Sequence, residues 1–137
     1  MLPHLLLVDD SLLVTEALGV LFEETGHRVT VAARVADAVA LCQGDAPDLM
    51  LLDVSLGDED GLEVLETLRR RGAPLPATVA MTGHDDPATR ERCLAAGCIA
   101  VLLKPVPIRE LLRIVAELVP SQVSRVQRLG GRGTRIA

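Results

Sequence analysis

Short, nearly continuous apolar runs alternate along this chain with longer segments in which apolar residues recur every three or four positions. The runs have the length and composition of buried β-strands, and the longer segments have the period of amphipathic helices. These runs lie at residues 4–8, 27–32, 47–54, 76–83 and 98–104, and the second of them alternates polar and apolar side chains like a strand. Strands that are apolar on both faces need helices on both sides, which favours a parallel sheet. We therefore predict an α/β fold, a doubly wound sheet of five parallel strands with five helices.

Two of these helices can be outlined further from the sequence. Ser11 can cap the first helix through its hydroxyl, and Gly26 suits the end of that helix because glycine adopts a positive φ at little cost. The apolar faces of the first and fifth helices are expected to be buried. They consist of Val14, Ala17, Leu18, Leu21 and Phe22, and of Ile108, Leu111, Leu112 and Val115.

Charge is distributed unevenly along the chain. All 19 acidic residues precede Pro120, together with ten of the 14 basic residues, so this body carries a net charge of −9. Residues 121–137 hold four arginines and no acid, a net charge of +4. We predict one domain over residues 1–120 and a Gly/Arg-rich tail or linker stub over residues 121–137. The acidic body, in which Phe22 is the sole aromatic residue, argues against direct nucleic-acid binding.

The cysteines follow no metal-binding spacing. We expect Cys42, Cys93 and Cys98 to be small, at least half-buried apolar side chains in a reducing compartment. The N-terminus has no basic stretch followed by a long apolar one, and no apolar stretch approaches the ~18 residues of a membrane span. These observations favour a cytoplasmic protein that does not contact a membrane.

Polar side chains stand where four of the apolar runs end. Asp9 and Asp10 follow the first run. The third, fourth and fifth runs end on Asp53, Thr82 and Lys104. The carboxyl ends of parallel strands meet at one edge of the sheet, where ligands bind in open α/β folds. Each residue alone would usually be a turn former or a solvated group, but their joint placement predicts a functional site at this edge.

Three carboxylates gathered at one edge repel one another, and neighbours ~4 Å apart in a partly dry site cost several kcal/mol. A hard divalent cation with oxygen ligands offsets that cost. Mg²⁺ is favoured because it accepts few carboxylates, keeps several waters and holds phosphate oxygens. We therefore predict a Mg²⁺ site that involves Asp9, Asp10 and Asp53.

Four motifs give the chain a resemblance to the receiver domain of two-component response regulators. They are VDDS (8–11), LLDVSLGDEDG (51–61), MTG (81–83) and LLKP (102–105), in the family's order and at about its spacing. The similarity extends over residues 4–119 and implies the strand order 2-1-3-4-5. It also implies a phosphorelay in which the partner is a sensor histidine kinase or a histidine phosphotransfer protein, and it leaves room for a homodimer.

The resemblance assigns roles to individual residues. Asp53 would accept a phosphoryl group from a phosphohistidine, while Thr82 and Lys104 would contact phosphoryl oxygens. The peptide bond between Lys104 and Pro105 would be cis. The Mg²⁺ ligands would be Asp9, Asp10, Asp53 and the backbone carbonyl of Ser55. Such a domain catalyses its own phosphorylation and dephosphorylation but is not a turnover enzyme.

The chain departs from the family pattern at several positions. Val101 stands where many receivers carry an aromatic residue that moves when the threonine engages phosphate, and Val106 stands where phenylalanine is common. The Thr–aromatic switch therefore cannot operate in its usual form. Gly57 replaces a frequent proline. The acidic residues 58–60 that follow form either a solvated turn or a set of charges that tunes cation affinity or partner choice.

Several alternatives stay open on the sequence alone. A degenerate receiver would serve only as a protein-interaction module. A metal-dependent phosphohydrolase with an aspartate nucleophile would need a second acid where Ser55 stands. Leu12 is either an ordinary exposed leucine or a docking residue for a histidine phosphotransfer domain. His84 either orients a hydrolytic water or is a plain loop histidine. The chain is either a stand-alone regulator or a receiver from a longer protein.

Overall fold

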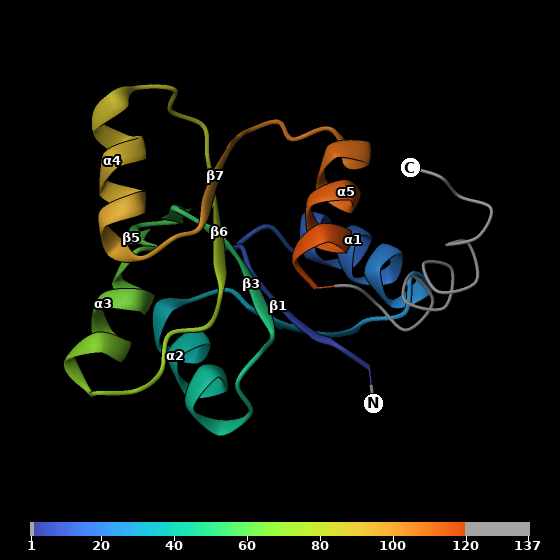
Figure 1. Cartoon of the computed structure of the whole chain (residues 1–137), viewed down its shortest axis with the longest axis horizontal. Helices are drawn as coiled ribbons and strands as arrows, with labels where there is room; N and C mark the ends of the chain where they lie inside the picture. Colours follow the sequence, from blue (N-terminus) through green and yellow to red (C-terminus); the bar gives the residue numbers. More distant parts are fainter. Residues whose placement is uncertain (1, 120–137) are drawn as a thin grey trace, which may run out of the picture.

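The computed structural model describes residues 2–119, which form a central parallel sheet between two layers of helices (Figure 1). The strands of the sheet are β1 (His4–Val8), β2 (Arg28–Ala32), β3 (Leu49–Asp53), β6 (Thr78–Thr82) and β7 (Ala100–Leu103). The helices are α1 (Leu12–Glu24), α2 (Val35–Gly44), α3 (Glu63–Arg70), α4 (Pro87–Ala96) and α5 (Ile108–Leu118). The predicted tail at residues 121–137 lies outside the described residues.

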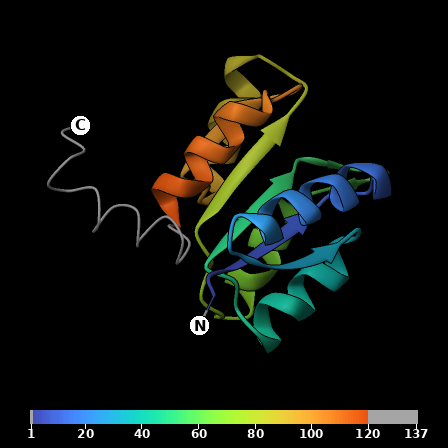
Figure 2. The ribbon, with the colours of Figure 1, turned by 90° about the vertical axis from the view of Figure 1, so that its right-hand side faces the viewer.

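The strand order is β2-β1-β3-β6-β7, and all neighbouring pairs are parallel. This confirms the predicted fold and the order 2-1-3-4-5, since β6 and β7 are the fourth and fifth predicted strands. Helices α1 and α5 cover one face of the sheet, and α2, α3 and α4 cover the other (Figure 1). The view turned by 90° shows the strands crossing between these layers (Figure 2).

The core is divided by the sheet into two apolar layers. Strands β1, β3 and β6 are buried over their whole length, so their side chains point alternately into one layer and the other. One layer contains Leu5, Leu7, Leu49 and Leu51 with Phe22 from α1 and Leu111 and Val115 from α5. The opposite layer contains Leu6, Val8, Met50 and Leu52 with residues of α2, α3 and α4. Burial on both faces explains the continuous apolar runs in the sequence.

Helix α1 begins and ends as predicted. The Ser11 hydroxyl accepts a hydrogen bond from the backbone N–H of Val14 at 3.3 Å, and Gly26 follows the helix with a φ of +93°. The predicted buried faces of α1 and α5 are only partly correct, because Val14 and Ile108 are 39% and 50% exposed. Both line a groove between the two helices instead of packing against the sheet.

A short antiparallel hairpin was not predicted. Strands β4 (Ser55–Leu56) and β5 (Glu59–Asp60) pair directly after the third strand of the sheet. The two residues between them are Gly57 and Asp58, and Gly57 has a φ of +60°. Proline, which is fixed near −65°, could not take that conformation. A Gly-Asp pair between two extended segments is a signal for such a hairpin.

The three cysteines are buried and free, as expected. Burial raises the pKa of the Cys42 thiol to about 11 and that of the Cys98 thiol to about 12, and it also raises the pKa of Cys93. Among the described residues, no helix is both long and apolar enough to cross a membrane.

Thiol reactivity should therefore report on unfolding. At pH 8 a thiol with a pKa of about 11 is ionised in roughly one molecule in a thousand, and only the thiolate reacts. We expect Ellman's reagent to label the native protein more than about 100-fold more slowly than the protein in denaturant. Rapid labelling of one equivalent in the native protein would contradict the buried placement of the cysteines.

Candidate functional site

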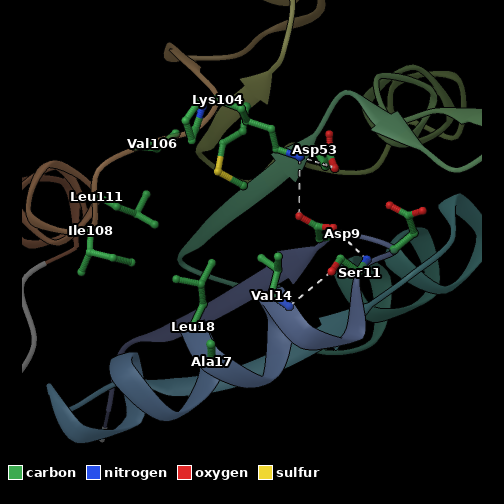
Figure 3. A pocket seen from close by; sticks show the side chains of 13 residues that line it. Asp9, Ser11, Val14, Ala17, Leu18, Asp53, Lys104, Val106, Ile108 and Leu111 are labelled. Carbon is green, nitrogen blue, oxygen red and sulfur yellow. Dashed lines mark hydrogen bonds and ion pairs between the residues drawn. The ribbon is translucent and has the colours of Figure 1, made fainter.

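The carboxyl ends of the strands bring three of the predicted site residues into direct contact (Figure 3). Asp53 is the last residue of β3, Asp9 follows β1 and Lys104 follows β7. The Lys104 ammonium Nζ lies 2.7 Å from Asp53 Oδ2 and 3.8 Å from Asp9 Oδ2. Lysine therefore bridges two carboxylates that come from neighbouring strands, β1 and β3, on either side of the topological switch point.

Asp9, Asp10 and Asp53 form an acidic cluster, since one carboxylate oxygen from each lies within 4.8 Å of the others. Asp9 and Asp53 are buried, and Asp10 is exposed. Burial raises the pKa of the Asp9 carboxyl. The backbone N–H of Ser11 and the Lys104 ammonium oppose this shift, while the charges of Asp53 and Asp10 reinforce it. The cluster thus carries an electrostatic cost that one lysine offsets only in part.

Backbone hydrogen bonds orient the two buried carboxylates. The N–H of Ser11 donates to Asp9 Oδ1 at 2.9 Å, and the N–H of Ser55 donates to Asp53 Oδ1 at 3.1 Å. In both cases the turn after the strand fixes the side chain, a pattern that comes from the local sequence. The predicted contribution of the Ser55 carbonyl to a metal site stays a prediction.

The acidic cluster fits a hard divalent cation. Its donors are carboxylate oxygens, which Mg²⁺ prefers, and they lie close enough together to share one ion. Asp10 faces solvent, so water molecules can supply the remaining ligands of an ion that usually keeps several waters. Asp9, Asp10 and Asp53 are the residues that would hold the ion.

Thr82 lies at the same edge, at the end of β6. Asp53 pairs in register with Met81, so Thr82 is one residue beyond the partner of the central carboxylate. The Thr82 hydroxyl accepts a hydrogen bond from the backbone N–H of His84 at 3.1 Å. The backbone carbonyl of Thr82 accepts one from the N–H of Lys104 at 2.7 Å. The bond between Lys104 and Pro105 is cis, as the family resemblance implies.

The two valines at family-aromatic positions lie on opposite sides of the sheet. Val101, in β7, is half-buried and packs against the α2–α3–α4 layer. Val106 packs against the α1–α5 layer and lines the groove between those helices. Neither position offers a long side chain that could change rotamer between buried and exposed states.

Of the acidic residues 58–60, Asp58 is exposed in the turn, as in the solvated-turn alternative, whereas Glu59 and Asp60 are half-buried and paired. A role of these charges in cation affinity or partner choice stays a prediction. Glu59 accepts from the backbone N–H of Val35 at 3.0 Å and pairs with Arg34, which ties the hairpin to the start of α2. Asp60 pairs with Arg92 of α4. Their partners are distant in sequence, so residue pattern alone gave no signal for these contacts.

A groove of about 590 Å³ opens directly beside the acidic cluster. One wall comes from α1, with Val14, Ala17 and Leu18, and the other from α5, with Ile108 and Leu111 (Figure 3). The three aspartates and Lys104 lie at one end of this groove. Leu12 is 69% exposed and begins α1 next to the same end.

Comparison with known proteins agrees with the resemblance to receiver domains noted in the sequence. The profile of the response regulator receiver domain family matches residues 5–116. The response regulator MprA of Mycolicibacterium vanbaalenii is 38% identical over 109 residues, which cover 80% of this chain and 47% of MprA. The sensor histidine kinase AruS of Pseudomonas aeruginosa is 38% identical over 121 residues, 84% of this chain and 12% of the kinase.

Solved structures agree on the fold. A CheY-like receiver domain protein from Methanospirillum hungatei superimposes with a TM-score of 0.76 at 29% identity, over 85% of this chain and 93% of that one.

The chain belongs to the response regulator receiver domain family. Members of this family are signalling modules of two-component systems that interact with histidine kinases, and they are not enzymes in the ordinary sense. The chain spans about half the length of MprA.

Proposed function

We propose that this chain takes a phosphoryl group onto the Asp53 carboxylate from a partner phosphohistidine, with Mg²⁺ held by Asp9, Asp10 and Asp53. The observation that carries the proposal is the 2.7 Å contact between Lys104 Nζ and Asp53 Oδ2 within a cluster of three carboxylates. A phosphoryl group can approach a buried carboxylate without net repulsion when an ammonium and a bound cation lie beside that carboxylate.

The chain's own residues would position and neutralise the phosphoryl group. One Asp53 oxygen is fixed by the Ser55 N–H, and the other is the oxygen that Lys104 contacts. As that second oxygen forms the new bond to phosphorus, the P–N bond to the donor histidine breaks and the imidazole leaves with the electron pair. Lys104 is then freed to pair with a phosphoryl oxygen. The Thr82 hydroxyl donates to another. The bound cation would neutralise charge on the phosphoryl oxygens.

The phosphodonor would dock over the groove between α1 and α5. The groove is apolar along α1 and α5 and acidic at the end where Asp53 lies, so an apolar helix face could seat there with its histidine over the cluster. Leu12 and Leu13, 69% and 79% exposed, extend the apolar surface beside the cluster. Leu12 was an open alternative in the sequence, and we assign it to this docking surface.

The remaining features of the proposal concern output. With valines at 101 and 106, phosphorylation would act through backbone shifts of the loops after β6 and β7. Leu94 of α4, Ile99 just before β7 and Leu103 of β7 are 49%, 51% and 46% exposed and could support a homodimer. We further propose a domain boundary near residue 120 and a cytoplasmic location. The observed site favours this reading over a degenerate receiver, because Asp9, Asp53 and Lys104 are in contact.

Phosphorylation by a small donor tests the proposal directly. Incubation with acetyl phosphate and Mg²⁺ should add one phosphoryl group to most molecules, measured by intact-protein mass spectrometry. The adduct should be lost in hydroxylamine, as an acyl phosphate is. A protein that gains no mass at any Mg²⁺ concentration would support the degenerate receiver instead.

Mg²⁺ should also stabilise the fold, because the cluster exists only in the folded chain. At a concentration about tenfold above the dissociation constant, the linkage is about 1.4 kcal/mol, or a rise of about 3–6 °C in Tm. Na⁺ at equal ionic strength is the control in a thermal melt. A melting temperature that does not change with tens of millimolar Mg²⁺ would contradict the proposed metal-binding site.

Replacing Lys104 with alanine should separate metal binding from transfer. The Lys104 ammonium pairs with Asp53 Oδ2 and competes with a cation for that oxygen. Loss of the ammonium should therefore leave Mg²⁺ affinity unchanged or tighter. Phosphorylation by acetyl phosphate should slow by about 100-fold or more, the usual effect of removing one such charge contact. The two effects are measured by thermal shift and by mass. Weaker Mg²⁺ binding in this variant would show that the lysine has another task.

A further inference from the structure

A second groove, which the proposed function does not use, lies between α1 and the edge strand β2. Its volume is about 440 Å³. It is lined by Leu12, Thr15, Glu16, Gly19, Val20 and Glu23 from α1 and by Val29 and Val31 from β2. Because β2 pairs only with β1, nothing in the described part of the chain continues the sheet beyond this edge.

The groove is open because α1 covers the edge strand incompletely. Gly19 faces β2 without a side chain, and even an added Cβ there would only touch Val29 at 3.9 Å. Val20 and Val31 remain 56% and 44% exposed on its two walls. Val20 and Val31 thus leave a small apolar surface along the groove, beside the acidic side chains of Glu16 and Glu23.

The end of α5 lies near one end of this groove. The carbonyl of Val119 accepts a hydrogen bond from His27 Nε2 at 3.2 Å. His27 immediately precedes β2, and Val29 lines the groove two residues later. Val119, the last described residue, therefore lies near the end of the groove that Glu23 and Val29 form.

The charges of the groove and of this segment are complementary. Glu16 and Glu23 are exposed along the groove, and the body as a whole is strongly acidic. Residues 120–137 contain four arginines and no acidic residue. They also contain apolar residues three positions apart, which could face the exposed valines. These are Val123, Val126 and Leu129.

The segment is also long enough. From Glu23 to Leu12 the groove follows α1 for roughly 16 Å at 1.5 Å per residue. Eighteen residues span about 27 Å if fully helical and about 60 Å if extended. Residues 120–137 can therefore run the length of the groove in any ordinary conformation.

We propose that residues 120–137 of this chain bind in the groove between α1 and β2, with arginines paired to Glu16 and Glu23 and apolar side chains against Val20 and Val31. The bound segment would reach Leu12, beside the acidic cluster, and so stand next to any partner that docks on the start of α1. The proposal involves no phosphoryl chemistry. It can therefore fail while the proposed function holds, and it can hold while the proposed function fails.

NMR on the full chain tests this contact. In the wild type, backbone amides of residues 120–137 should give heteronuclear NOE values near those of the folded body at low salt. The double variant Glu16→Arg/Glu23→Arg should lower them to values typical of a free chain. In the variant Arg125→Glu/Arg128→Glu the methyl signals of Val20, Val29 and Val31 should shift. About 1 M NaCl should weaken the contact, because exposed charges are screened over a few ångströms.

The matched control is Glu66→Arg/Glu91→Arg, which makes the same charge change at exposed sites on α3 and α4, in the other layer. It should leave the NOE values of residues 120–137 unchanged. Free-chain values in the wild type would overturn the proposal, as would equal losses in both double variants. Ordering that appears only as protein concentration rises would also overturn it, since the groove would then hold the segment of a second copy.

Discussion

Changing Asp53 to asparagine is expected to abolish the uptake of a phosphoryl group from acetyl phosphate. The carboxylate is the attacking group in the proposed reaction, and an amide oxygen neither attacks phosphorus nor carries charge for the cation seat. The substitution preserves shape, and the Ser55 N–H can still donate to the side-chain oxygen. The fold should therefore survive while the mass shift disappears.

Asp58→Asn is the matched control, since Asp58 is an exposed acid five residues further on. It should be phosphorylated like the wild type. Circular dichroism of both variants confirms folding. An unchanged mass shift in Asp53→Asn, with the adduct mapped to another residue, would remove Asp53 from the role of acceptor and require a different reading of the cluster.

Alanine at Gly61 is expected to be the most destabilising small substitution in the site region. Gly61 packs against the backbone at the end of β3, and its N–H donates to the carbonyl of Val54 at 2.6 Å. An added Cβ would overlap the carbonyl oxygen of Asp53 and lie 3.2 Å from the Cα of Val54. Backbone atoms cannot move aside as a side-chain tip can. We expect a loss of about 2–4 kcal/mol in the free energy of unfolding.

Gly44→Ala provides the comparison. Gly44 ends α2, has an exposed position and has nothing within 4 Å of an added Cβ. This variant should be neutral or up to about 1 kcal/mol more stable, as expected for glycine replaced in a helix. Urea unfolding of both variants gives the difference. Equal stabilities would mean that the hairpin moves freely relative to β3, against the close packing described above. A folded Gly61→Ala protein should also be phosphorylated more slowly, because its Asp53 is displaced.

Much of the fold and of the site could be read from local patterns. Runs such as Leu49–Asp53 are apolar on both faces, and only a strand buried between two helical layers needs that composition. Asp9, Asp53 and Lys104 could be placed together because parallel strands end at a common edge. Ser11 and Gly26 marked the ends of α1 because capping depends on one or two residues.

The contacts that sequence did not predict depend on partners far along the chain. Glu59 and Asp60 look like solvated charges until α2 and α4 supply Arg34, the Val35 N–H and Arg92. Val14 and Ile108 have the period of buried residues. They are partly exposed because a groove separates α1 from α5. The Gly57-Asp58 hairpin had a local signal, which the acidic composition of the loop obscured.

The sequence by itself determined the order of elements, the two buried faces of the central strands and the identity of the charged residues at the strand ends. These follow from periodicity and from single-residue backbone preferences, which act over a few positions. Only the tertiary structure decided which charges are paired, how close Lys104 approaches Asp53, and where α1 leaves apolar surface uncovered. Those properties depend on distances of a few ångströms between separate elements, and packing, not local pattern, sets such distances.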